Sequence, residues 1–173
     1  SAGQAGIEVA GASVRLRGNT IEDSGWMGTF GGVEVSDSSR DVRIDGNVIR
    51  NRDTKFQDYG IWIHSGPRNT VISPTQFREN AIAAILDEGT NTVIETRILD
   101  TSFPDSELGS RVKIFAPPGS RGQVQVSGNL TNWTSAIPFS ADLNGEASVR
   151  VTAELLQTAS RYFRVAHTET AEE

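Results

Sequence analysis

The amino-acid sequence predicts an all-β protein in two modules: a coil of stacked parallel strands over residues 1–105, and a small antiparallel β-sandwich over residues 106–173. Three observations support this prediction: the composition, a repeat in the first hundred residues, and a change of pattern after residue 100. Of the 173 residues only 36% are apolar and 17 are glycine, which favours short strands joined by turns over long helices. The length suits one ordinary domain or two small ones.

Charge and composition exclude several classes of protein. Ten basic and sixteen acidic residues fall in residues 1–109, against six of each in residues 110–173, so residues 1–109 hold the whole net charge of -6. This negative field repels polyanions and argues against nucleic acid as a partner. No apolar run approaches the roughly 18 residues of a membrane span, so we expect no membrane partner. The absence of cysteine excludes disulfides, thiolate nucleophiles and cysteine-based zinc sites.

Two short strings recur along the first hundred residues, and a fixed period of this kind indicates a repeat architecture. Within each string apolar and polar residues alternate, which is the period of a half-buried strand and not of a helix. The copies are GIEV at 6–9, GVEV at 32–35 and GIWI at 60–63, then VRLRGNTI at 14–21 and VRIDGNVI at 42–49, with weaker copies at 70–77 and 92–99.

Strands this short cannot bury their apolar side chains alone, so successive copies are expected to stack as a coil of parallel strands. Asn19 and Asn47 occupy the same register after glycine. The glycine backbone adopts a left-handed turn easily, and an amide side chain can bond to the equivalent turn of the next coil. The pair predicts an asparagine ladder, with two unconnected turn asparagines as the alternative.

These repeats resemble the right-handed parallel β-helix of the pectate-lyase-like superfamily over residues 6 to about 100. The resemblance implies a secreted or cell-surface bacterial protein that degrades a polysaccharide, as a lyase or a glycoside hydrolase. The alternative is a non-catalytic glycan-binding adhesin or tailspike segment, because one fold hosts many activities. Pro74-Thr75 and Thr96-Arg97 replace the Gly-Asn pair in the last two copies, which predicts that the helix ends there.

Residue 6 already lies within a complete repeat. We therefore expect the chain to be the C-terminal piece of a longer protein, with missing N-terminal coils or another chain capping the open helix end. An exposed strand edge and apolar interior would otherwise face water. The alternative is a naturally short or designed helix that is capped by dimerisation.

A polar segment over residues 101–109 separates the two modules. Beyond it, alternating strings predict antiparallel strands at 111–115, 122–126, 147–151 and 161–165. The strings at 126–134 and 161–165 resemble a C-terminal accessory module of secreted bacterial enzymes. Trp133 in the first of them is either a core residue or a platform for a sugar ring.

Aligning the copies predicts one outward column of Glu8, Glu34, Trp62 and Ala84 along the first strand of each coil, because their neighbours point inward. Adjacent rungs lie about 4.8 Å apart. Neighbouring carboxylates at this spacing can divide acid and base roles, as in a glycosidase. The alternative is a column of solvated charges.

The long loops before this strand, at residues 22–31 and 50–59, are expected to form a binding face. In the resembled enzymes such loops wall a groove for an extended sugar chain. Calcium is a possible cofactor, because some lyases of this fold use it, but no ligand set can be assigned from dispersed aspartates. The predicted catalytic residues are Glu34, His64, Asp53 and Lys55, and the predicted substrate-binding residues are Glu8, Trp26, Arg52, Asp58, Tyr59 and Trp62.

Overall fold

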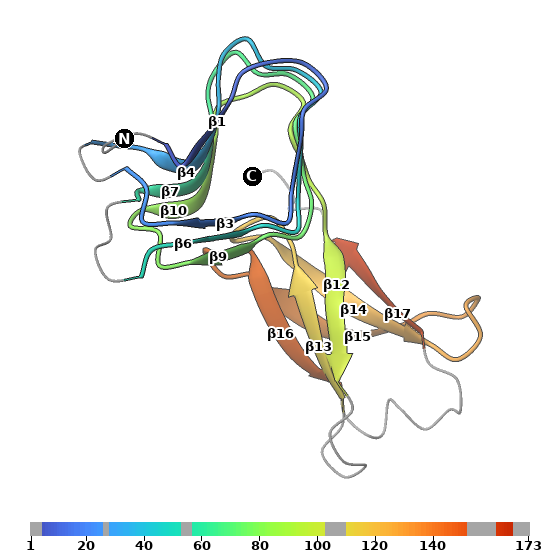
Figure 1. The fold of residues 1–173 in the computed structure, drawn as a ribbon. Helices are drawn as coiled ribbons and strands as arrows, with labels where there is room; N and C mark the ends of the chain where they lie inside the picture. Colours follow the sequence, from blue (N-terminus) through green and yellow to red (C-terminus); the bar gives the residue numbers. More distant parts are fainter. Residues whose placement is uncertain (1–4, 26–27, 53–56, 103–109, 152–161, 168–173) are drawn as a thin grey trace, which may run out of the picture. The chain divides into compact units, whose positions relative to one another are not determined.

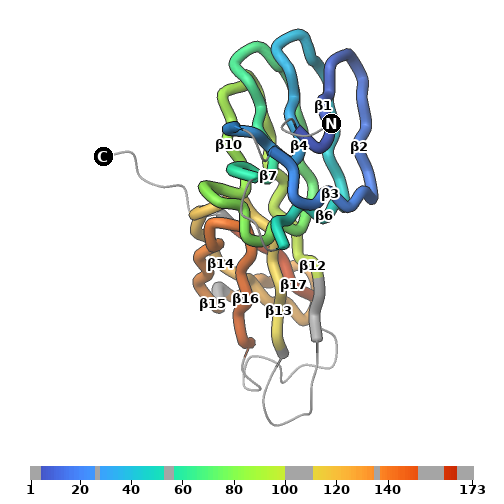
Figure 2. Tube along the Cα trace, turned by 60° about the vertical axis from the view of Figure 1, so that its left-hand side comes forward, coloured from blue at the N-terminus to red at the C-terminus, as the bar shows by residue number. Residues whose placement is uncertain are grey.

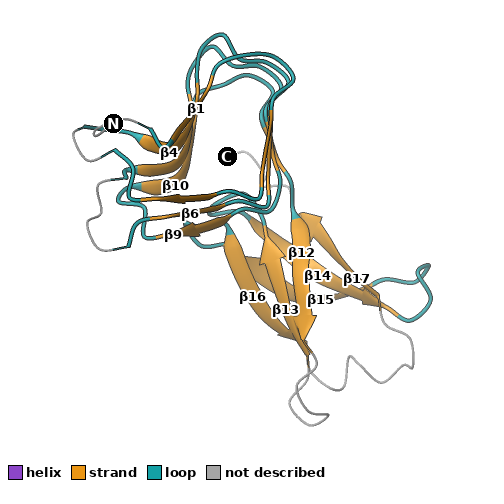
Figure 3. Cartoon of the chain, viewed as in Figure 1, coloured by secondary structure: helices purple, strands orange, loops and turns teal. Residues whose placement is uncertain are grey.

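The fold was analysed in a computed structural model, which describes residues 5–25, 28–52, 57–102, 110–151 and 162–167. Strands and loops make up this described part (Figure 3), and it contains no helix long and apolar enough to cross a membrane. The chain divides into two compact units, Ser1–Glu95 and Thr96–Glu173.

The first unit is a parallel β-helix, as the repeat predicts. Three parallel sheets form its faces, and each coil contributes one strand to each sheet until the last coil (Figure 1). The first sheet contains β1 (Ile7–Val9), β4 (Gly31–Val35), β7 (Tyr59–Ile63) and β10 (Ala83–Asp87). The second contains β2 (Arg15–Arg17), β5 (Arg43–Asp45), β8 (Val71–Ile72) and β11 (Val93–Ile94). The third contains β3 (Thr20–Glu22), β6 (Val48–Arg50) and β9 (Gln76–Arg78).

Equivalent residues of successive coils lie next to one another (Figure 2). Their inward side chains stack into apolar columns. In the third sheet Ile21 pairs with Ile49 and Ile49 with Phe77. All three side chains are buried. Burying such a side chain contributes about 1.5–3 kcal/mol, so the alternating aliphatic residues of the repeat supply the interior of the first unit.

The recurring glycines stand where the coil has no room for a side chain. A Cβ added to Gly60 would lie 2.4 Å from the Phe77 ring and 2.5 Å from the carbonyl oxygen of Ala84. At Gly32 it would lie 2.5 Å from Ile49, and at Gly6 it would be equally close to Ile21. The glycine that opens each repeat therefore allows the first strand to approach the third-sheet column of its own coil.

The predicted asparagine ladder is confirmed. The Asn47 Oδ1 accepts hydrogen bonds from the backbone N–H of Asn19 at 2.9 Å and from its Nδ2 at 3.1 Å. The Nδ2 of Asn47 donates to the carbonyl oxygens of Leu16 and Asp45, both at 3.1 Å. In the next coil Thr75 takes this position and donates to the carbonyl oxygen of Ser73.

A second ladder, which the sequence analysis missed, lies at another corner of the coil. Asn69 donates to Asp41 at 2.9 Å, and Asn91 donates to Asn69 at 3.4 Å. All three residues have a left-handed backbone, with φ between 54° and 58°. Their polar side chains link the coils at a turn that L-residues otherwise avoid.

The parallel stack ends at Glu95, next to the Thr96-Arg97 pair at which the sequence predicted its end. β11 pairs with β8, but the residues that follow form β12 (Arg97–Ser102), which pairs antiparallel with β13 (Ser110–Phe115). The prediction that residues 97–99 continue the fourth coil is therefore wrong. The units divide at Glu95 and Thr96 instead of the expected residue 105, because β12 is hydrogen-bonded to the second unit.

The second unit contains two three-stranded antiparallel sheets. The predicted strands are present, and β12 and β15 complete the sheets. One sheet has the order β12-β13-β16, with β16 at Glu146–Val151. The other sheet has the order β15-β14-β17. Its strands are β14 (Arg121–Ser127), β15 (Thr134–Ser140) and β17 (Tyr162–His167). Buried side chains from both sheets, among them Ile114 and Val124, form one apolar cluster, as in a β-sandwich.

The ladder yields a first prediction. Replacement of the buried Asn47 by alanine leaves the amide and carbonyl partners of its side chain unsatisfied, and is expected to lower the free energy of unfolding by about 3 kcal/mol. Urea denaturation followed by circular dichroism measures this change.

The matched control is Asn19→Ala, at the half-buried end of the same ladder. It leaves the backbone bond from residue 19 to Asn47 in place, so we expect a loss of about 1 kcal/mol. Equal losses in the two variants would contradict a structural role for the Asn47 side chain beyond that of an ordinary turn residue.

Candidate functional site

The outward column on the first sheet is largely as expected. Glu8 pairs with Glu34, and Glu34 pairs with Trp62. The fourth member is Leu86 instead of Ala84. The placement of Ala84 on the outward face is wrong, and Ala84 is buried at 2% exposure. The step from β7 to β10 is 24 residues, because Ala83 pairs with Tyr59 (83 - 59 = 24). The step of 22 residues applies only to the following strand, where Val93 pairs with Val71 (93 - 71 = 22).

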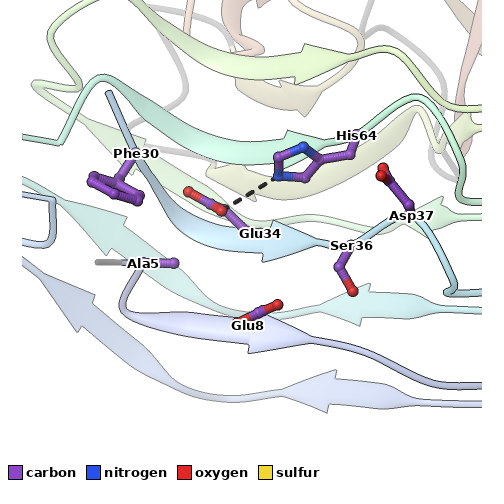
Figure 4. A pocket seen from close by; sticks show the side chains of 7 residues that line it. All are labelled: Ala5, Glu8, Phe30, Glu34, Ser36, Asp37 and His64. Carbon is purple, nitrogen blue, oxygen red and sulfur yellow. Dashed lines mark hydrogen bonds and ion pairs between the residues drawn. The ribbon is translucent and has the colours of Figure 1, made fainter. Parts of the chain in front are cut away.

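A pocket of about 290 Å³ opens over this face of the sheet (Figure 4). The side chain of Glu34 is fixed at both oxygens: Oε1 accepts from the backbone N–H of Gly31 at 2.9 Å, and Oε2 lies 3.3 Å from Nε2 of His64. Glu34 keeps 12% of its side chain exposed and His64 keeps 29%, so a solute can reach both groups. The pocket is lined by Ala5, Glu8, Phe30, Glu34, Ser36, Asp37 and His64.

Aromatic contacts hold His64 in place beside Glu34. Its imidazole stacks on the Trp62 indole, with ring centroids 4.4 Å apart and planes inclined by 16°. Tyr59 packs against the same indole at 5.7 Å. The indole N–H of Trp62 donates to Glu88 at 2.9 Å. The orientation of the His64 ring therefore depends on its stacking against Trp62, and the Trp62 ring is itself held by its hydrogen bond to Glu88.

The charges of the pocket decide what it can bind. Three carboxylates line it, from Glu8, Glu34 and Asp37, together with one histidine. No lysine or arginine occurs among its described lining residues. Such a site provides acceptors for sugar hydroxyls and groups for proton transfer, and it repels a ligand that bears its own carboxylate.

Trp26, Asp53 and Lys55 fall outside the described residues. Asp58 is half-buried, and its backbone N–H donates to the carbonyl oxygen of Phe30 at 3.1 Å. Its side chain is not among those that line the pocket.

Arg52 is held in an ion-pair network, and it does not line the pocket. Its backbone N–H donates to Asp23 Oδ1 at 2.7 Å and its Nε donates to Asp23 Oδ2 at 3.1 Å. Its guanidinium also lies 3.3 Å from Glu22, which pairs with Arg50 as well. These contacts join the ends of β3 and β6 on neighbouring coils, so they anchor the chain where it enters the long loop.

Four residues of the site were missed in the sequence. Phe30, Ser36 and Asp37 flank β4 and line the pocket, and Glu88 holds Trp62. Ser36 directly follows Val35, and Glu88 directly follows Asp87, so extending the repeat alignment by one residue brings both next to His64 in the register. Phe30 lies in the loop at residues 22–31 that was expected to form a binding face, although it was not among the predicted site residues.

Metal binding finds no support in the described part of the chain, where no group of three or more histidine, aspartate and glutamate side chains is arranged to hold an ion. Calcium therefore remains an expectation from the resemblance. The chemistry considered below uses only the side chains of the pocket.

The stacked parallel sheets define the first unit as a parallel β-helix protein. A family described as a right handed beta helix region matches residues 3–130, and the chain belongs to that family. No curated protein matches the chain. The family match extends into the second unit, where the described strands pair antiparallel.

The loop anchor yields a pH prediction. The pKa of Asp23 lies below its ordinary 3.8, chiefly because the backbone N–H of Arg52 donates to the carboxylate, with further lowering from the charges of Arg52 and Arg50. A depressed pKa stabilises the folded state above the unfolded-state pKa, and the contribution is lost as pH falls through the folded value.

Asp23→Asn removes this charge. The difference in free energy of unfolding between wild type and variant is expected to be largest above about pH 4 and to shrink below it. Because 28% of the Asp23 side chain is exposed, solvent screening keeps the difference small. Urea denaturation at several pH values measures it, and a difference that stays constant across this range would contradict the assignment.

Proposed function

We propose that this β-helix protein binds a polysaccharide along the outward face of the first sheet and hydrolyses it at the pocket around Glu34. The observation that carries the proposal is the contact of Glu34 with His64 inside a pocket that also contains Glu8. The resemblance to polysaccharide-active members of the pectate-lyase-like superfamily supports the same substrate class. Secretion or attachment to the surface of a bacterial cell, where polysaccharides are met, forms part of the proposal.

Glu34 acts as the nucleophile in this scheme. The N–H of Gly31 and Nε2 of His64 orient its two oxygens, so that little reorganisation is needed during the reaction. Glu8 lies opposite Glu34 on the neighbouring rung and serves as the acid and base. The rung spacing of about 4.8 Å is close to the roughly 5 Å between the carboxyl groups of retaining glycosidases.

Pocket charge favours hydrolysis of an uncharged sugar over lyase chemistry. A lyase that acts on uronic acids must accommodate the substrate carboxylate, and cations suit that purpose. The described lining of this pocket has Glu8, Glu34 and Asp37 instead. Like charges at this range oppose binding, so a neutral glycan is the preferred substrate.

Substitution of Glu34 tests the proposal. Glu34→Gln keeps the size of the side chain but removes the nucleophile, so release of reducing ends from neutral polysaccharides is expected to fall at least about a thousandfold. His64→Gln, which leaves Glu34 in place but less well oriented, is expected to reduce turnover by about tenfold or more. The assay uses a panel of xylan, β-glucan and galactan with the full chain.

Glu95→Gln is the matched control. Glu95 pairs with Arg43 and does not line the pocket, so its loss changes net charge equally without touching the site. Full activity in both the Glu34 and the His64 variants would overturn the assignment of this pocket.

A second candidate function is glycan binding without cleavage. Both oxygens of Glu34 already contact protein groups, namely the N–H of Gly31 and Nε2 of His64. A carboxylate held in this way can also bind a sugar hydroxyl without taking part in a reaction, which favours this second function. On this alternative no product forms at any pH, and Glu34→Gln leaves binding unchanged. Trp62→Ala weakens binding up to about tenfold through loss of an aromatic contact, as measured by calorimetry.

A further inference from the structure

The second unit contains a groove of about 460 Å³ that the pocket chemistry does not use. Three consecutive residues from each of two strands line it: Thr96, Arg97 and Ile98 at β12, and Phe163, Arg164 and Val165 at β17. Both are edge strands, since β12 lies at the end of one sheet and β17 at the end of the other. The groove thus lies along an open side of the two-sheet unit.

Its lining combines an apolar floor with two cations. Ile98, Phe163 and Val165 are partly buried and pack against the apolar cluster of the unit. Arg97 and Arg164 alternate with them along the strands and are exposed, so their side chains leave the strands on the opposite face and lie at the rim of the groove. No acidic side chain occurs among the described residues that line the groove. The groove therefore has the opposite charge to the pocket on the first unit.

Two contacts fix the orientation of the Arg164 guanidinium. Its guanidinium lies 4.4 Å from the centroid of the Trp133 ring, and its Nε donates to Gln125 Oε1 at 2.6 Å. The indole N–H of Trp133 donates in turn to the carbonyl oxygen of Leu130 at 3.2 Å, which fixes the ring. The Nε bond leaves the two terminal amino groups of Arg164 as donors. A guanidinium fixed in this way loses less conformational entropy when it binds a planar anion.

We propose that this groove binds an acidic sugar unit, with Arg97 and Arg164 recognising its carboxylate or sulfate group. Arginine matches such oxyanions through paired, charge-assisted hydrogen bonds. The apolar floor at Phe163 offers a surface of the kind that packs against the carbon face of a sugar ring. This proposal goes beyond the one for the pocket, because the two sites bear opposite charge and select different sugar units.

Calorimetry with the full chain tests the inference. Trigalacturonic acid is the carboxylate probe, its fully methyl-esterified form is the uncharged equivalent, and a sulfated galactan oligosaccharide is the sulfate probe. We expect one or both anionic probes to bind and the ester not to bind, and the preferred anionic probe identifies the group recognised. Binding should weaken as NaCl is raised, because the contacts are ionic.

Variants link the binding to the groove. Arg164→Gln and Arg97→Gln are each expected to weaken binding of the anionic probe by about tenfold or more. Arg164→Lys retains the charge but loses the planar fork, and should lie between wild type and Arg164→Gln. The matched control Arg150→Gln removes the same charge from β16, which does not line the groove, and should bind as wild type. Circular dichroism verifies that each variant is folded.

Failure of both anionic probes to bind would overturn the proposal, as would binding of the methyl ester as tightly as the preferred anionic probe or unchanged binding in both arginine variants. Binding of a short peptide with a free C-terminal carboxylate, in place of every sugar probe, would overturn it in favour of a protein partner. The Glu34→Gln variant should bind the anionic probes as wild type does. The outcome is therefore independent of catalysis at the pocket.

Discussion

The first unit depends on one constraint: backbone hydrogen bonds between parallel strands require successive coils to lie in register. Once Ile21, Ile49 and Phe77 are paired in this way, the inward column that they form must be apolar from coil to coil. The close approach of Gly32 and Gly60 to the interior, and the hydrogen bonds of Asn47 to the coil above, both follow from this alignment.

The same register brings the residues of the pocket together. Glu8 and Glu34 lie opposite each other because their strands pair, although they are far apart in the sequence. Side-chain contacts then refine the arrangement, as Trp62 stacks on His64 and His64 meets Glu34. The elements that stabilise the coil, such as the ladders at Asn47 and Asn69, lie at other corners. The pocket can therefore differ in chemistry without loss of the scaffold.

Much of this was predictable from the sequence. The strands, the Asn19–Asn47 ladder and the alignment of Glu34 with Trp62 followed from a nearly constant period. Ala84 was misplaced because the step of 22 residues between β8 and β11 does not apply between β7 and β10, and a change of loop length is invisible to an alignment of strands. Residues 97–99 were misassigned because parallel and antiparallel strands share one alternation. The Glu34–His64 contact and the Trp133–Arg164 stack depend on rotamers, which no spacing encodes.

The column of glycines at positions 6, 32 and 60 has a consequence for how such a protein changes in evolution. Each of these glycines meets an equivalent aliphatic or aromatic neighbour within its own coil, so a single coil is an interchangeable unit. Duplication or deletion of one complete repeat in the gene would keep this glycine contact in every turn. The length of the outward face of the first sheet can thus evolve in whole steps, while point mutations alter only its chemistry.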